Sequence, residues 1–180
     1  MISGSPESLL EHARIAKREN RLGEAAEQFR KALTECVPSG SPTLCATLFE
    51  ELAYVERNLQ DLNTSLKLYR QASRVYRDLG NPLKAAHAMR HAADILREQK
   101  RQDEAAPLYA EALEIYRKHK DTPPLDLANA IRGLALLKED VGDRTEALSL
   151  WREARDLYEL TAIPAGVSES DRRIGLLIAD

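Results

Sequence analysis

The stretch DEAAPLYAEALEIY, from Asp103 to Tyr116, decides the fold because its small and aromatic residues follow the period of a helix. Ala105, Tyr109, Ala112 and Tyr116 are spaced at i, i+4, i+7 and i+11, which places them along one helical face. The stretch therefore predicts an amphipathic helix. Its alternation of alanine and ring favours close packing, since paired helices approach only where one is small and the other fills the gap.

The same spacing occurs four times along the chain. The small residues that begin it are separated by 40, 40 and 42 residues: Ala25, Ser65, Ala105 and Ala147. The aromatic residues four positions later are Phe29, Tyr69, Tyr109 and Trp151. An earlier set of alanines keeps the same three intervals: Ala13, Ala53, Ala93 and Ala135. Because a fixed period of this length indicates a repeated supersecondary unit, each repeat is predicted to carry two helices.

Turns and helix breakers delimit the repeats. Short polar or glycine-containing turns separate the two helices of each repeat, at residues 20–23, 58–61, 100–103 and 141–144. Prolines separate one repeat from the next, within residues 38–42, 80–82 and 121–124. We expect four helical hairpins at about residues 6–38, 42–80, 82–122 and 124–160. One hairpin cannot bury its own apolar face, so stacking into a single all-α solenoid domain over residues 1–180 is predicted.

These small residues, rings and prolines resemble the tetratricopeptide repeat (TPR) family over about residues 6–160. The repeats of 40 to 42 residues exceed the usual 34, and the stretch with Pro107 looks like the longer repeats of kinesin light chains. Ser65 and Cys36 depart from the pattern, which has alanine and tyrosine there. The resemblance implies a right-handed superhelix whose first helices line a concave groove, and a non-enzymatic scaffold that binds a protein or peptide.

The last residues predict a separate helix at 165–179, with Ile174, Leu177 and Ile178 at helical spacing. Ser168 followed by Asp171 is a typical start for it. One interpretation is a capping helix that covers the last repeat, as the ends of solenoids require. The alternative is a surface for self-association, which would make the chain a structural unit of a homo-oligomer.

The resemblance also places the binding groove on a stripe along the first helices. Its predicted partner-binding residues are Arg14, Lys17, Tyr54, Arg57, His87, Arg90, Asp94, Arg97, Asn129 and Arg132. Arginine forks suit carboxylates, so a partner segment that is acidic is one interpretation, with Tyr54 as an aromatic contact. The other is a solvated face of mixed charge, since carboxylates such as Glu50 and Asp94 lie among the cations.

One group of residues raises the alternative of a metal site on the third repeat. His87, His91 and Asp94 follow one another at i, i+4 and i+7, a spacing that suits zinc or iron. Ala88 stands where the glutamate of a zinc-protease helix would be, and Arg90 and Arg97 would oppose a cation. The chain has no phosphate-binding glycine loop and no nucleophile motif, so we expect neither an enzyme nor a cofactor.

Composition narrows the partners further. A formal charge of −3 with 31% charged residues lacks the basic excess that nucleic acid binding needs. The sequence has no apolar run of about 18 residues and does not begin like a signal peptide, so a cytoplasmic location away from membranes is expected. Cys36 and Cys45 fit no metal or redox spacing and are interpreted as free thiols, with a disulfide between them as the alternative.

Overall fold

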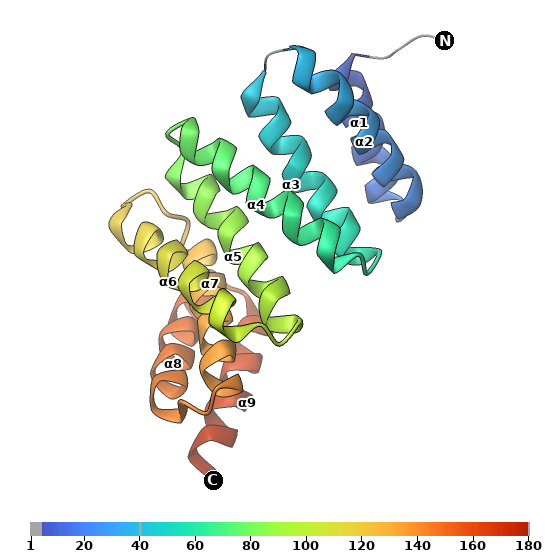
Figure 1. The fold of residues 1–180 in the computed structure, drawn as a ribbon. Helices are drawn as coiled ribbons and strands as arrows, with labels where there is room; N and C mark the ends of the chain where they lie inside the picture. The colour runs from blue at the N-terminus through green and yellow to red at the C-terminus, as the bar shows by residue number, and fades with distance from the viewer. Residues whose placement is uncertain (1–4, 40, 180) are drawn as a thin grey trace. The chain divides into compact units, whose positions relative to one another are not determined.

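The structure, a computed structural model, describes residues 5–39 and 41–179, and the described residues form nine helices (Figure 1). Their bounds are α1 Pro6–Arg18, α2 Leu22–Ser39, α3 Pro42–Asn58, α4 Leu62–Asp78, α5 Pro82–Glu98, α6 Gln102–Lys118, α7 Pro124–Asp140, α8 Arg144–Leu160 and α9 Pro164–Ala179. The first eight helices pair into hairpins. The predicted all-α fold of helical hairpins with a terminal helix is confirmed.

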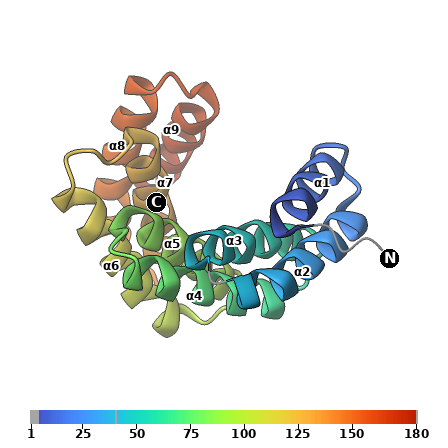
Figure 2. The same ribbon diagram turned by 90° about the horizontal axis from the view of Figure 1, so that it is seen from above.

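The helices group into two compact units, Met1–Ala88 and Met89–Asp180, so that α5 contributes one half to each. In the first unit α2 packs against α1 and α3, and α3 packs against α4. In the second unit α7 packs against α6 and α8, and α9 packs against α8. Figure 2 shows α7, α8 and α9 together within this second unit.

The core of each hairpin consists of the repeated small and aromatic residues. The alanines of the first helices are fully buried: Ala13, Ala53, Ala93 and Ala135. The rings of the second helices are buried to the same degree: Phe29, Tyr69, Tyr109 and Trp151. The predicted alternation of small and large side chains is therefore what closes the hairpins.

The helix ends follow from local sequence. Every first helix begins with a proline, whose missing N–H costs nothing in the first turn: Pro6, Pro42, Pro82, Pro124 and, in α9, Pro164. The turns after six of the described helices hold one residue in the left-handed region, such as Asn20 at φ 58°. This lets the N–H of Arg21 reach back to the carbonyl of Ala16 at 2.9 Å and satisfy the end of α1.

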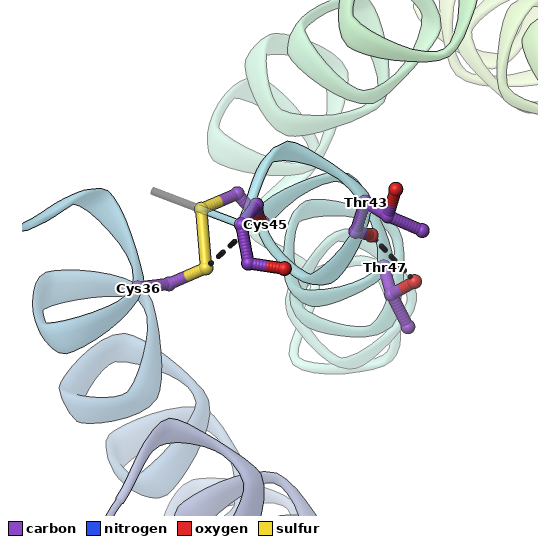
Figure 3. Close-up of a disulfide and its surroundings, with 5 residues drawn as sticks. Cys36, Thr43, Cys45 and Thr47 are labelled. Carbon is purple, nitrogen blue, oxygen red and sulfur yellow. Dashed lines mark hydrogen bonds between the residues drawn. A yellow bond between two sulfur atoms is a disulfide. The ribbon is translucent and has the colours of Figure 1, made fainter. Parts of the chain in front are cut away.

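Cys36 and Cys45 form a disulfide that joins the end of α2 to the start of α3, with Cα atoms 5.8 Å apart (Figure 3). The prediction of free thiols is therefore wrong. Free thiols would have favoured a reducing compartment such as the cytoplasm, and the disulfide does not. The physical reason lies in the repeat. Tyr76 and Tyr158, at the equivalent position, each pack against the next first helix, Tyr76 beneath the Lys84 ammonium at 5.3 Å. Cys36 makes the same connection with a covalent bond.

Helix α9 confirms the predicted terminal helix at 165–179 and begins one residue earlier, so Ser168 is not its first residue. It starts at Pro164, and the N–H groups of Gly166 and Val167 both donate to the carbonyl of Ile163. Ser168 is thus an interior residue. Gly166 is needed here because a Cβ atom would lie 2.4 Å from the ring of Tyr158.

Candidate binding surface

The ten predicted groove residues are placed on the first helix of each hairpin. In the first unit, α1 carries Arg14 and Lys17, α3 carries Tyr54 and Arg57, and α5 carries His87. In the second unit, α5 carries Arg90, Asp94 and Arg97, and α7 carries Asn129 and Arg132. We call these two sets the first stripe and the second stripe.

A carboxylate that the sequence analysis missed organises the first stripe. Arg14 Nε donates to Glu51 Oε1 at 3.0 Å, and Lys17 Nζ bonds the other oxygen of the same carboxylate. Lys17 also lies over the ring of Tyr54, 5.2 Å from its centre. The Tyr54 side chain is nevertheless half exposed, at 48%. Two cations and one exposed ring thus gather around one carboxylate.

Glu50 forms a second polar group in the first unit. His87 Nδ1 lies 2.5 Å from Glu50 Oε1, and the Tyr76 hydroxyl donates to Oε2 at 3.0 Å. Burial disfavours the ionised carboxylate, but the hydrogen bond and charge of His87, with help from Tyr76, outweigh it and lower the pKa of Glu50. Burial in turn raises the pKa of the Tyr76 phenol to about 12. This group is a packed hydrogen-bond network rather than a reactive site.

Asp94 occupies the centre of the second stripe. It accepts from Arg90 Nη1 at 3.0 Å and from the Tyr109 hydroxyl at 2.6 Å. Burial, reinforced by the charge of Asp94, raises the pKa of the Tyr109 phenol. Gly133 permits this arrangement, because a Cβ atom there would lie 2.5 Å from the Tyr109 ring.

The remaining cations of the second stripe are also paired. Arg97 donates to Asp140 at 3.1 Å. Arg132 holds Glu169 of α9 through two hydrogen bonds of 2.6 and 2.8 Å, the bidentate geometry that suits arginine. Asn129 accepts from the Tyr158 hydroxyl, and burial raises the pKa of that phenol to about 12.

The charge balance differs between the two stripes. In the first, Arg14 and Lys17 share Glu51, which leaves one positive charge in excess. In the second, Arg97 and Arg132 each have a carboxylate. Each cation and its carboxylate lie on successive first helices. The carboxylates are Glu51 on α3, Asp140 on α7 and Glu169 on α9. A comparison of residues about 37 positions apart would have indicated the pairs with Glu51 and Glu169.

The proposed metal-binding residues have other partners. His87 bonds Glu50, while Asp94 accepts from Arg90 and Tyr109. Among residues 5–39 and 41–179, no three His, Cys, Asp or Glu side chains are arranged to hold a metal ion. The structure therefore does not support the metal-site alternative.

Loss of the Glu169 charge should remove the stabilising effect of its pair with Arg132. The hydrogen bond from Arg132 lowers the pKa of Glu169 below its ordinary value of 4.5. A carboxylate whose pKa is lower in the folded state than in the unfolded state stabilises the fold fully above its unfolded-state pKa. This stabilisation is lost as the pH falls through its folded-state pKa. Glu169→Gln should therefore lower the thermal midpoint at pH 7 and lower it by less at pH 3, as followed by circular dichroism.

Glu153→Gln is the matched control, because the Glu153 pair with Arg117 is exposed and contributes little. An equal loss for Glu169→Gln at both pH values would contradict the role assigned to its charge.

Within the described part of the chain, no helix has both the length and the apolar character that crossing a bilayer requires. Among curated proteins, none matches the sequence. Solved structures do match its fold. BtubC from P. vanneervenii superposes with a TM-score of 0.82 at 19% identity, over 95% of this chain and 70% of that one.

Two Rap proteins show the same fold at lower identity. The apo form of RapI has a TM-score of 0.88 at 13% identity, over 97% of this chain and 63% of RapI. A Rap protein complexed with Competence and Sporulation Factor has a TM-score of 0.76 at 15% identity, over 94% of this chain and 47% of that protein. The chain thus spans about two thirds of RapI and about half of the second protein.

The family model supplies the identification. Residues 44–118 match the tetratricopeptide repeat model, over the second and third predicted repeats. The hairpins on either side also bury an alanine of the first helix and a ring of the second helix at the repeated positions. Residues 44–118 therefore form tetratricopeptide repeats, and the flanking hairpins are built in the same way.

Proposed function

We propose that the chain is a protein-binding module that holds a segment of another protein on its first stripe. Tetratricopeptide repeats typically mediate protein–protein interaction and are generally non-catalytic. The observation that carries the proposal is the half-exposed Tyr54 ring beneath Lys17, with Glu51 shared by two cations. An exposed aromatic side chain with a polar tip is typical of interface anchors.

The excess positive charge around Glu51 favours an acidic partner segment. A partner carboxylate placed near Arg14 and Lys17 would complete the pairing that Glu51 begins alone. Such an interaction is only partly buried, so it contributes more to partner choice than to affinity. The second stripe has its cations matched and would add polar contacts without a preference for acidic residues. A Rap protein of the same fold has been crystallised in complex with Competence and Sporulation Factor, which supports the proposal that this fold can hold a binding partner.

A displayed library of random 12-residue peptides tests this function with the whole chain as bait. We expect the selected peptides to be rich in Asp and Glu and to bind more weakly as salt rises. Tyr54→Ala should weaken the best peptide at least tenfold, while Tyr54→Phe, which keeps the ring, should lose little.

Lys67→Glu, an exposed change on α4, is the charge control and should leave binding unchanged. If the selected peptides are not enriched in Asp and Glu, the proposed preference for an acidic partner segment is wrong. If the peptides bind Tyr54→Ala with the same affinity as the unmodified chain, the first stripe is not the binding surface.

A further inference from the structure

The part of the first stripe around Glu51 is divided between two hairpins. Arg14 and Lys17 lie on α1, in the first hairpin, whereas Glu51 and Tyr54 lie on α3, in the second. The ion pairs of both cations with Glu51, and the contact of Lys17 with the Tyr54 ring, therefore exist only while the two hairpins are held together. The geometry of this surface thus depends on the junction between the hairpins.

That junction contains the disulfide. Cys36, near the end of α2, bonds Cys45, near the start of α3 (Figure 3). Between the hairpins that follow, and between α8 and α9, the residue equivalent to Cys36 is a buried tyrosine: Tyr76, Tyr116 and Tyr158. A tyrosine ring fills its junction by size, whereas two thiols occupy less volume and connect the helices only through the S–S bond. The first junction can therefore be opened by thiol chemistry, to which a tyrosine is inert.

An ion pair joins the same two helices at another point. Arg30 of α2 bonds the carboxylate of Glu56, a residue near the end of α3 that is only 2% exposed. Cys45 lies near the other end of α3. Cleavage of the disulfide leaves the ion pair in place. Reduction would thus release one end of the α2–α3 contact and leave the other as a hinge.

A dithiol reductant can carry out this cleavage. Cys36 is completely buried, but Cys45 is only half-buried, so the incoming thiolate attacks Sγ of Cys45. A mixed disulfide forms at Cys45, and the sulfur of Cys36 leaves and takes up a proton. The second thiol of the reductant then displaces Cys45, which gives two cysteine thiols and the oxidised dithiol. The reverse exchange with an oxidised dithiol forms the bond again.

We propose that the Cys36–Cys45 disulfide is a redox switch for the first stripe, so that its reduction weakens the binding of an acidic partner segment. This inference rests on the proposed function, because it concerns the control of the same surface. The reduced chain must bring α1 and α3 together when it binds, and this ordering lowers its affinity. By thermodynamic linkage, a bound partner must protect the disulfide from reduction by the same factor.

Fluorescence anisotropy with the whole chain tests the switch. The probe is the best 12-residue peptide from the displayed library, labelled with a fluorophore and measured before and after treatment with dithiothreitol. We expect binding at least about fivefold weaker after reduction, the lower end of typical couplings between linked sites. The double variant Cys36→Ser, Cys45→Ser should bind as weakly as the reduced chain and should not respond to dithiothreitol.

The linkage supplies a second measurement. In mixtures of reduced and oxidised dithiothreitol, saturating peptide should raise the ratio needed for half reduction by the factor that reduction takes from the affinity. Trp151→Ala is the control for a loss of stability without an opened junction, because it removes a large buried ring from the second unit. This variant should keep the peptide affinity of the oxidised chain.

Hydrogen exchange separates this inference from the proposed function. Reduction should speed amide exchange in α1 and α2 and leave α7 and α8 unchanged. If oxidised and reduced chains bind the peptide equally well, the switch is overturned and the proposed function stands. If neither binds, the proposed function fails, and exchange that speeds up in α1 and α2 alone still supports redox control of the junction. Exchange that is unchanged, or that speeds up equally in α7 and α8, overturns the switch, as does loss of the helical circular dichroism signal on reduction.

Discussion

Replacement of Trp151 by alanine should destabilise the chain by about 3–5 kcal/mol, the cost of truncating a large buried ring. Trp151 is completely buried in α8, and its Nε1 donates to Glu139 of α7 at 2.5 Å. Arg173 of α9 bonds the same carboxylate and lies over the ring, 5.9 Å from its centre. One side chain therefore connects three helices of the second unit, and its removal leaves both a cavity and a carboxylate with fewer partners.

Urea unfolding followed by circular dichroism measures this loss. Tryptophan fluorescence cannot be used, because Trp151 is the single tryptophan of the chain and the variant lacks it. Trp151→Phe is the control. It keeps most of the buried area and loses the hydrogen bond to Glu139, so its cost should be less than half that of Trp151→Ala. Equal costs for the two variants would mean that the hydrogen bond, and not ring packing, holds α8 against its neighbours.

The helices and their packing could be predicted because they depend on local sequence. The period that aligns Ala105 with Tyr109 recurs in every hairpin, and prolines and turns mark the helix ends close to where the structure has them. The predicted range 165–179 for the last helix lies one residue from its observed start at Pro164, whereas Ser168, a good helix start by itself, is inside the helix. Pro164, the same signal that opens the other first helices, was the better indicator.

The sequence predicts which residues form the polar stripes, but it did not show which carboxylates pair with their cations. The stripe was read one helix at a time, whereas the partners of its cations lie on the next first helix. Arg14 and Arg132 have their carboxylates 37 residues later, at Glu51 and Glu169. Such long side chains reach a partner only after the hairpins have stacked, so this pairing is a property of packing rather than of any single segment. The acidic-partner hypothesis stays a prediction, and the pairing of the cations in the second stripe restricts our proposal to the first stripe.

The sequence analysis favoured free thiols at Cys36 and Cys45 over the disulfide because the evidence for the bond lies in the repeat rather than in the cysteine spacing. Cys36 replaces the tyrosine that repeats two to four use at the end of the second helix. A cysteine is too small to fill the place of that ring. A second cysteine at the start of the next helix, Cys45, restores the connection covalently.

Removal of this disulfide should lower the free energy of unfolding by about 2.5 kcal/mol, the chain-entropy value for a closed loop of about ten residues. Cys36 and Cys45 are nine positions apart and join the first hairpin to the second, where the other repeats have a packed ring. A reductant should therefore lower the thermal midpoint of the unmodified chain. The double variant Cys36→Ser, Cys45→Ser should begin at the lower midpoint and show no response to reductant.

Two further variants separate the covalent bond from the packing that it replaces. Cys45→Ser alone should match the double variant, because a single thiol at Cys36 closes no loop. Cys36→Tyr with Cys45→Ala restores the pattern of the later repeats, in which Tyr158 packs on Gly166 at the start of the next helix. If a ring and a disulfide serve the same connection, this variant should recover part of the lost stability and be insensitive to reductant. A midpoint no higher than that of the double serine variant would show that the first hairpin depends on the bond itself.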